Sequence, residues 1–284
     1  MTSASSLPPV GSSPHPTSSG TVPLKRIAIF AATSWEMGAV RAAFPSSVER
    51  RIDGVHVFVC ASGRREYWLA QTGVGLEKAG QVASRLLGHQ PFALAVSTGF
   101  ACALIKAEIG ALLVGRDVVF VGAQGSEKSH AIDVPGVERE TVLALAGDAV
   151  HPNHVGRFVS ADRIISSALE KGRLARTTGA IGLDMESTAL AIEAQRAQVP
   201  FVIVRAASDL LDEDLLLDFN HFLRPTGWLK GIAAVLGAPS SLLALGRLRR
   251  QSLAARKNLT SFFQRYAAVM ATDEEGERTI TSRL

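Results

Sequence analysis

Residues 179–212 read GAIGLDMESTALAIEAQRAQVPFVIVRAASDLLD, and the fold class is predicted mainly from these residues. From Met185 onward, apolar residues recur at the spacing of an amphipathic helix. Pro200 ends that pattern, because proline lacks a backbone donor and favours extended geometry in the residue before it. The apolar run 201–204 is typical of a strand buried on both faces, and Asp209 stands where it ends. The stretch therefore predicts an α/β protein whose ligand binds at the carboxyl ends of its strands.

Two carboxylates in this stretch, Glu186 and Asp209, are candidates for chemistry. In the ordinary interpretation Glu186 is an exposed helix residue and Asp209 caps the next helix, since charged side chains are mostly solvated. Their neighbours favour a functional interpretation, because Glu186 follows Met185 near a helix start and Asp209 ends a strand that is apolar enough to be core. The residues alone leave both interpretations open.

Two motifs, Asp-Met-Glu at 184–186 and Arg-x-x-Ser-Asp at 205–209, together resemble the signature of the purine nucleoside phosphorylase superfamily. The chain is most similar to its 5'-methylthioadenosine/S-adenosylhomocysteine nucleosidase branch. The resemblance is continuous over about 180–222 and extends in weaker stretches back to Ile27. It implies a single α/β domain with a central mixed, partly barrel-like sheet flanked by helices. It also implies an enzyme that hydrolyses the N-ribosidic bond of a purine nucleoside and releases adenine.

The same resemblance implies roles for four residues of the two motifs. Asp209 would protonate the departing purine at N7, with Ser208 orienting it. Burial would have to raise the pKa of Asp209 for it to hold a proton near neutral pH. Glu186 would bind the ribose hydroxyls, and Met185 would pack under the sugar.

Glu36 is the third carboxylate of interest, in the first turn of the helix that follows the predicted strand 25–31. The helix dipole alone would favour a Glu there. In the resembling nucleosidases this position holds the acidic residue that orients the attacking water, whereas phosphorylase relatives have a glycine-rich, arginine-bearing phosphate loop. The segment 33–36 follows the nucleosidase pattern, and the loop 72–75 would lie beside the ribose or phosphate. The resemblance implies neither a metal nor an organic cofactor.

The chain departs from the nucleosidase pattern at two places that would contact substrate. Where the family typically has Thr-Gly-Ser-Ala-Gly-Gly, residues 98–103 read TGFACA, so a Phe narrows the sugar pocket or makes it apolar. Where the family commonly stacks adenine on an aromatic ring, the chain has isoleucines, so aliphatic contact would hold the base. The segment that closes over the 5' side of the nucleoside would also contribute a Phe. The expected contacts in these regions are Thr98, Gly99, Phe100, Ile164 and Phe219.

Composition divides the 284 residues into four parts. Residues 1–24 are rich in Ser, Pro, Gly and Thr and lack the pattern of a secretory signal, so we expect a disordered tail. The catalytic domain is expected over 25–223, a basic amphipathic helical extension over 224–270, and a flexible end over 271–284. Both cysteines lack metal-type spacing and are expected to be buried in a reducing compartment.

The positive charge of the chain is concentrated near its end. The formal net charge is +4, yet eight Lys and Arg and no acidic residue lie between 219 and 272, which leaves −4 for the rest. One interpretation is a helical hairpin over 228–236 and 241–259 that packs on the body. The other is a cationic surface for anionic lipid through 224–265. We do not expect nucleic-acid binding, because few aromatic residues interleave the charges.

Three functional alternatives remain beside hydrolysis of a soluble adenine nucleoside. A phosphorylase would use phosphate instead of water, but the chain has no convincing anion loop. A nucleoside whose 5' group is a lipid, of the adenosylhopane type, would suit the apolar Phe100 and the basic extension. A non-catalytic nucleoside- or membrane-binding module is disfavoured by the three carboxylates. We expect a homodimer in the cytoplasm, either free or peripheral at the inner face of the membrane.

Overall fold

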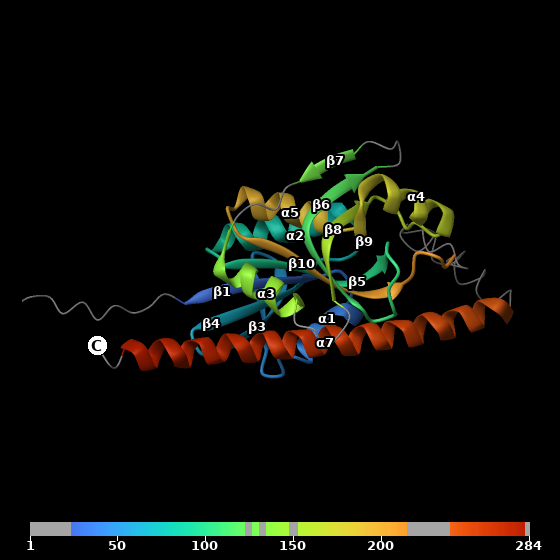
Figure 1. Ribbon diagram of the computed structural model, residues 1–284. Helices are drawn as coiled ribbons and strands as arrows, with labels where there is room; N and C mark the ends of the chain where they lie inside the picture. The colour runs from blue at the N-terminus through green and yellow to red at the C-terminus, as the bar shows by residue number, and fades with distance from the viewer. Residues whose placement is uncertain (1–23, 123–126, 131–134, 148–152, 215–238, 282–284) are drawn as a thin grey trace, which may run out of the picture.

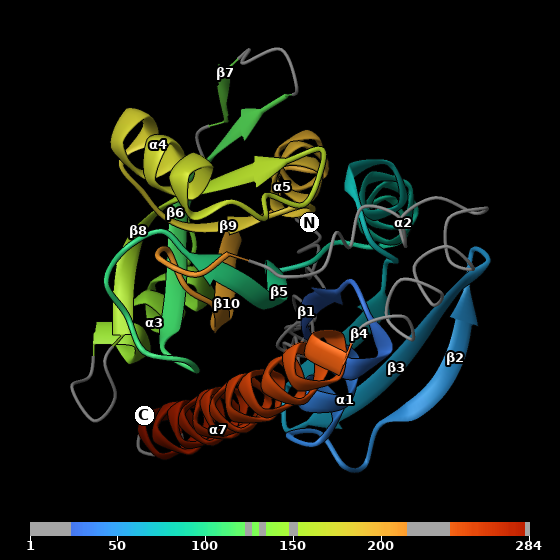
Figure 2. The same ribbon diagram turned by 90° about the vertical axis from the view of Figure 1, so that its right-hand side faces the viewer.

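The computed structural model describes residues 24–122, 127–130, 135–147, 153–214 and 239–281 of the chain (Figure 1). A ten-stranded mixed sheet is covered by helices on both sides, and one long helix runs along its underside (Figures 1 and 2). The strands are β1 (Lys25–Ala31), β2 (Val48–Ile52), β3 (Val55–Ser62), β4 (Arg65–Gln71), β5 (Leu94–Ala103), β6 (Leu112–Val121), β7 (Glu127–His130), β8 (Asn153–Ala161), β9 (Ala180–Asp184) and β10 (Phe201–Asp209). The helices are α1 (Ser34–Arg41), α2 (Leu76–His89), α3 (Val137–Gly147), α4 (Ala168–Thr178), α5 (Ser187–Arg196) and α7 (Pro239–Thr281).

Part of the sheet closes on itself. The strands follow the order β10-β6-β8-β9-β5-β1-β4-β3-β2, and β10 also pairs with β5. The five strands β5, β10, β6, β8 and β9 therefore form a ring, while β1, β4, β3 and β2 extend from it as an open sheet. The sheet contains parallel pairs such as β1–β5 and β10–β5 and antiparallel pairs such as β10–β6 and β5–β9. The expected mixed, partly barrel-like sheet is confirmed.

The predicted buried strand is β10, and it lies between β5 and β6. Its first seven residues are at most 2% exposed, which explains why the run is apolar without alternation. The pairing with β5 shifts register between Ala207 and Asp209, so Ser208 is the extra residue of a β-bulge. Adjacent residues of a regular strand point to opposite faces, and a bulge changes that alternation. The bulge lets Ser208 and Asp209 both reach the same cavity.

Of the three apolar clusters of buried residues, the two larger ones lie on the two faces of the sheet. One packs α2 and α5 against the upper side in Figure 1, and it includes Leu86, Leu190 and Phe201. The other packs α1, α3 and α7 against the lower side and includes Val40, Val142 and Phe262. The two free cysteines, Cys60 and Cys102, are buried, as expected.

Helix α7 is docked on the body by an apolar stripe. The stripe repeats every three to four residues and consists of Ala255, Leu259, Phe262, Phe263, Tyr266 and Met270, none more than 1% exposed. Tyr266 meets Tyr67 edge to face with ring centroids 6.2 Å apart. Thr260 Oγ1 donates to the carbonyl of Ala39 at 2.8 Å, which joins α7 to α1. Packing of this helix therefore completes the lower core.

The structure describes one half of the expected hairpin. Residues 241–259 belong to one continuous helix that runs on to Thr281, across most of the segment expected to be flexible. A helix this long is stabilised because its central part packs on the body. The other half of the expected hairpin, 228–236, lies outside the described residues, as does the expected tail up to residue 23. Over the described ranges, no helix combines the length and the apolarity needed to cross a membrane.

Candidate active site

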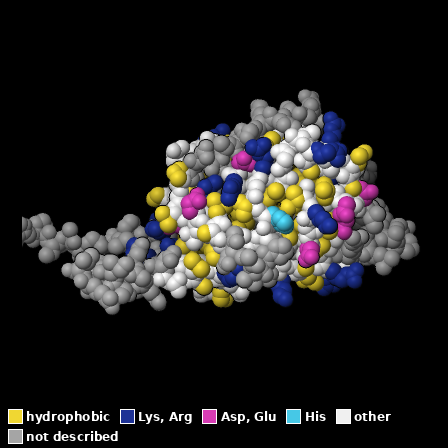
Figure 3. Space-filling view, in the orientation of Figure 1, with side chains coloured by type: hydrophobic (Ala, Val, Ile, Leu, Met, Phe, Trp, Pro, Cys, Tyr) yellow, Lys and Arg dark blue, Asp and Glu magenta, His cyan; other side chains and the backbone are white. Residues whose placement is uncertain are grey.

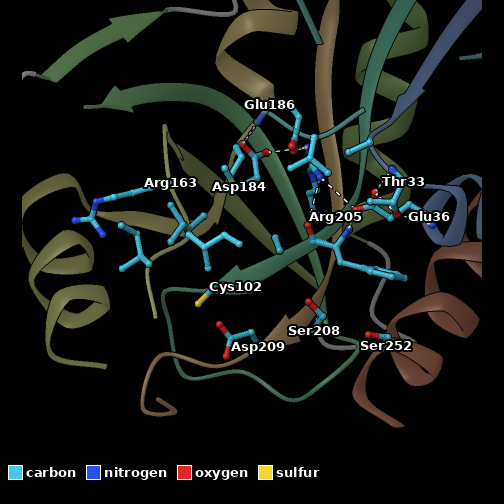
Figure 4. A pocket seen from close by; sticks show the side chains of 18 residues that line it. Thr33, Glu36, Cys102, Arg163, Asp184, Glu186, Arg205, Ser208, Asp209 and Ser252 are labelled. Carbon is cyan, nitrogen blue, oxygen red and sulfur yellow. Dashed lines mark hydrogen bonds and ion pairs between the residues drawn. The ribbon is translucent and has the colours of Figure 1, made fainter. Parts of the chain in front are cut away.

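A cavity of about 440 Å³ opens where β1, β5, β9 and β10 end or turn, and α7 forms part of its wall (Figure 4). The lining is mostly apolar, with the carboxylates Glu36, Asp184, Glu186 and Asp209 among it. Ser252 of α7 also lines it, so a residue of the extension reaches the cavity. A mostly apolar pocket with a few convergent polar groups is typical of a small-molecule site.

Arg205 of β10 is the centre of one side of the cavity. Its Nη2 lies 3.1 Å from Asp184 Oδ2 and 3.4 Å from Glu186 Oε2, and its Nη1 lies 3.8 Å from Glu36 Oε1. Figure 4 shows the three carboxylates converging on this guanidinium. Arg205 is 1% exposed, and a buried charge needs partners of opposite sign. The four residues, which we call the Arg205 cluster, carry more negative than positive charge.

Asp184 is the structural member of the Arg205 cluster. Its Oδ1 accepts a hydrogen bond from Ser160 Oγ at 2.6 Å and others from the backbone N–H groups of Glu186 and Ser187. Its Oδ2 accepts from Ser187 Oγ. These bonds hold the turn from β9 into α5 and so fix the position of Glu186 at the helix N-cap.

Glu186 faces the cavity from that turn. Its Oε1 accepts a hydrogen bond from the backbone N–H of Gly75 at 2.9 Å, so the loop 72–75 does lie beside it. Burial raises the pKa of Glu186 to about 7, helped by the nearby negative charges of Asp184 and Glu36 and opposed by Arg205. Glu186 is therefore expected to be protonated in part of the molecules near neutral pH.

Glu36 caps helix α1 and also lines the cavity. It forms a capping box with Thr33, because its Oε2 accepts from Thr33 N at 2.8 Å and from Thr33 Oγ1 at 2.9 Å. Its Oε1 accepts from the backbone N–H of Phe100 at 2.8 Å. A carboxylate offers about four acceptor positions, so Glu36 keeps acceptor capacity for a ligand in the cavity it lines.

Gly99 makes room for this arrangement. Its φ of +139° is a conformation that side chains disfavour, and a Cβ there would lie 2.2 Å from Glu36 Oε1. Thr98 lies behind it, fully buried, with its hydroxyl donating to the carbonyl of Val204 at 2.8 Å. Neither Thr98 nor Gly99 is among the residues that line the cavity, so their expected contacts with substrate stay a prediction.

Asp209 stands on another side of the cavity, apart from the Arg205 cluster (Figure 4). Its Oδ2 accepts a hydrogen bond from the Lys171 ammonium at 2.7 Å, and Cys102 lies near it with its thiol donating to the carbonyl of Ala103 at 3.4 Å. Burial raises the pKa of Asp209, while Lys171 and then Cys102 act in the opposite direction. Burial also raises the pKa of the Cys102 thiol, so this group remains neutral.

The remaining predicted residues are distributed as follows. Met185, Phe100, Ile164 and Ser208 line the cavity together with the three carboxylates singled out from the sequence. Phe219 lies outside the described residues. Residues that the sequence reasoning did not assign to the site are Asp184, Arg205, Arg163, Lys171, Cys102 and Ser252. Arg205 and Asp184 could have been found, because they belong to the two motifs, whereas nothing in the sequence marks Lys171.

Comparison with known proteins places the fold. Residues 26–224 match the family model of the phosphorylase superfamily. A candidate 5'-methylthioadenosine/S-adenosylhomocysteine nucleosidase from Francisella philomiragia is 16% identical, with a TM-score of 0.67 over 86% of this chain and 99% of that one. The S-adenosylhomocysteine nucleosidase of Streptococcus pyogenes in complex with 5-methylthiotubericidin is 18% identical, with a TM-score of 0.62 over 87% and 99%. A futalosine hydrolase mutant from Helicobacter pylori is 20% identical, with a TM-score of 0.60 over 74% and 99%.

These solved structures share the fold of this chain over almost their whole length. The family model covers more than two thirds of the chain and includes every element that contributes to the cavity except α7. The chain therefore belongs to the phosphorylase superfamily.

Proposed function

We propose that this member of the phosphorylase superfamily hydrolyses the N-ribosidic bond of a purine nucleoside and releases adenine. Breaking this bond leaves positive charge on the sugar and negative charge on the departing base. A cavity for it needs anionic groups near the sugar and a proton donor near the base. The Arg205 cluster and Asp209 offer these groups on different sides of one cavity. The similar structures, which include two nucleosidases and a hydrolase, support the reaction class.

Asp209 is the proposed general acid. It would give its proton to N7 of the purine as the bond breaks, so that the base leaves neutral. Burial raises its pKa, which favours the protonated form that this role requires. Ser208 is adjacent through the bulge and lines the same wall. Ile164 offers aliphatic contact for the base.

The Arg205 cluster is the proposed sugar site. Glu186 would accept hydrogen bonds from the ribose hydroxyls, with Met185 beneath the sugar, and its charge would stabilise the oxocarbenium-like centre. Glu36 would hold the attacking water with its remaining acceptor capacity. No step of this scheme calls on a metal or an organic cofactor.

The charge balance of the Arg205 cluster is the observation that favours water over phosphate. The single guanidinium is already matched by Asp184, Glu186 and Glu36. Even with Glu186 protonated, two carboxylates face one cation, so the cluster repels an anion. The other arginine of the lining, Arg163, pairs with Glu170. A phosphorylase site would instead present unmatched cations.

Base release tests the proposal. Purified protein is incubated with 5'-methylthioadenosine, S-adenosylhomocysteine, adenosine and inosine, with and without phosphate. We expect adenine release that does not depend on phosphate, and a loss of about 10²- to 10⁴-fold in Asp209→Asn. Asp53→Asn is the matched control, because Asp53 is exposed and its positive φ suits Asn. No release from any nucleoside, or equal activity of Asp209→Asn, would overturn it.

A second candidate substrate is a lipid-linked nucleoside of the adenosylhopane type, met at an anionic membrane surface. It is favoured by the basic side chains Arg249, Arg250 and Lys257, which are exposed on α7 beside the exposed Leu253. The same helix contributes Ser252 to the cavity. Lys and Arg side chains are visible along the lower edge of the face in Figure 3, where α7 runs. The surface of α7 that carries these basic side chains would thus bind the membrane next to the cavity.

Sedimentation with liposomes tests this candidate. We expect binding to phosphatidylserine liposomes that salt weakens, and a loss of at least tenfold when Arg249, Arg250 and Lys257 are changed to Glu, since each basic residue contributes about 1 kcal/mol. The control is the same change at the exposed Arg50, Arg51 and Lys78. Removing α7 would be uninformative, because it carries core residues. Equal loss in both variants would rule out a surface specific to α7.

Assembly and location complete the proposal. We propose a homodimer in the cytoplasm, free or peripheral at the membrane. Exposed apolar side chains such as Trp35, Val48 and Leu169 are available for a contact between copies. Light scattering after size exclusion should give twice the mass of the chain, and a monomer would remove the dimer from the proposal.

A further inference from the structure

Lys171 is a fully buried cation that the proposed mechanism does not use. It lies on the inward face of α4 with Leu174 and Thr178, at helical spacing, and it is 0% exposed. A lysine is rarely buried without a strong reason, because taking an ammonium out of water costs several kcal/mol unless it is paired and hydrogen-bonded. Here the partner is the proposed general acid.

All three donors of the Lys171 ammonium are used. Nζ donates to Asp209 Oδ2 at 2.7 Å, to the carbonyl of Leu210 at 3.2 Å and to the carbonyl of Glu213 at 2.7 Å. A lysine has three N–H donors, so it is fully satisfied by the end of β10 and the residues that follow. The Glu213 side chain in turn accepts from Gln251 of α7 at 3.1 Å, next to the cavity residue Ser252. Lys171 thus joins α4, the end of β10 and the wall of the cavity.

We propose that Lys171 is a positioning residue for the general acid: it holds the Asp209 carboxyl in place and stabilises the carboxylate left when the proton passes to the departing base. This inference rests on the proposed function. In the step itself, the bond between the sugar and the base breaks and its electron pair goes to the base. N7 takes the proton of Asp209, and Lys171 keeps its own protons. The Asp209 carboxylate regains a proton from water after the base leaves.

The surroundings of Asp209 define what the removal of Lys171 should do. The ionisable groups that face it are Lys171 from α4 and Cys102 from β5, while Glu213 follows in the chain and Arg163 lines the same cavity. Lys171 is the one of these whose charge opposes the effect of burial on the pKa of Asp209. Without it the acid would be weaker, and its proton would be lost at higher pH.

The test compares the pH profiles of wild type, Lys171→Met, Lys171→Arg and the control Lys106→Met, whose lysine is exposed outside the cavity lining. In Lys171→Met we expect kcat to fall at least tenfold at an almost unchanged KM. The alkaline limb of kcat/KM should move up by about one pH unit or more. Lys171→Arg should keep the limb near its wild-type position, and in the Asp209→Asn background Lys171→Met should cost little more. A fall in kcat with an unmoved limb would reduce Lys171 to a structural anchor and overturn the proposal.

A second measurement needs no substrate, so it separates this proposal from the proposed function. The carboxyl band of Asp209 is followed by infrared difference spectroscopy against Asp209→Asn while the pH is varied. Its midpoint should rise in Lys171→Met, or in Lys171→Gln if the Met variant does not fold. An unchanged midpoint would overturn the proposal even if the wild type releases adenine. A raised midpoint in a protein that releases no base would contradict only the function.

Discussion

On one side of the cavity three carboxylates surround a single guanidinium, whereas on another side one carboxylate faces a single ammonium. Both groups of charges are buried, so burial and the neighbouring charges together set their protonation. Burial raises the pKa of Glu186 to about 7, and the charges of Asp184 and Glu36 add to this rise while Arg205 opposes it. Around Asp209, the Lys171 ammonium limits the effect of burial instead. One fold therefore holds two kinds of carboxylate within one cavity, as a reaction that separates charge requires.

The largest effect on stability is expected when the cation of the Arg205 cluster is removed. Arg205→Met leaves three buried carboxylates without their cationic partner, so the free energy of unfolding should fall by about 3–5 kcal/mol at pH 8. The loss should be smaller at pH 5, where the carboxylates can take up protons. Urea denaturation at the two pH values checks this, with Arg205→Lys, which keeps the charge, as the control. If Arg205→Met were as stable as wild type at pH 8, Arg205 would not be needed to balance the three carboxylates, and the account of this cluster would be wrong.

The next effect concerns Glu186 and its proton. Its pKa rises from an ordinary value near 4.5 to about 7 on folding, so its contribution to stability is full below about 4.5 and lost as pH rises through 7. The loss is about 3 kcal/mol, at 1.36 kcal/mol per pKa unit. Relative to wild type, Glu186→Gln should therefore become more stable between pH 5 and pH 8, although it should lose activity.

Urea denaturation of Glu186→Gln at both pH values measures this change. The exposed Glu77 gives the control Glu77→Gln, whose surroundings change little on unfolding. If the free energies of unfolding of both variants change equally with pH, the pKa of Glu186 is not raised on folding, which would contradict this prediction.

The smallest expected effect distinguishes the two roles of Glu36, which are to cap α1 and to hold the attacking water. Thr33→Ala removes one half of the capping box, so it should cost about 1 kcal/mol of stability. It should reduce kcat less than tenfold, because Phe100 N and Thr33 N still hold the carboxylate. Glu36→Gln should cost about 100-fold in kcat, in the range of acid–base groups. Similar losses of kcat in the two variants would mean that Glu36 acts only as a cap.

The sequence was most informative where the pattern is local. The helix–proline–strand pattern predicted α5 and β10, because periodicity and Pro200 act within a few residues. The closure of the ring by β5–β10 and β5–β9 pairs could not be read from periodicity, since these strands are far apart along the chain. The single long α7 was missed because 241–259 has the same apolar spacing whether or not the helix continues.

The same limit applies to the site. Glu186 and Asp209 were predicted from two specific motifs and Glu36 from a weaker resemblance, and all three line one cavity. Thr98 was also predicted as a contact, but its hydroxyl donates to the carbonyl of Val204 within the sheet, a pairing that the local sequence does not reveal. Lys171 was missed because a lysine on an amphipathic helix is usually solvated, and only the tertiary fold shows that its face of α4 turns inward.

The identity of the sugar product tests the central claim most directly. Wild-type protein is incubated with 5'-methylthioadenosine in phosphate buffer, and the products are identified by mass spectrometry. The charge balance around Arg205 predicts adenine and a free reducing sugar, formed at the same rate whether or not phosphate is present. A sugar 1-phosphate that appears only with phosphate would contradict hydrolysis and leave Glu36 without the water assigned to it.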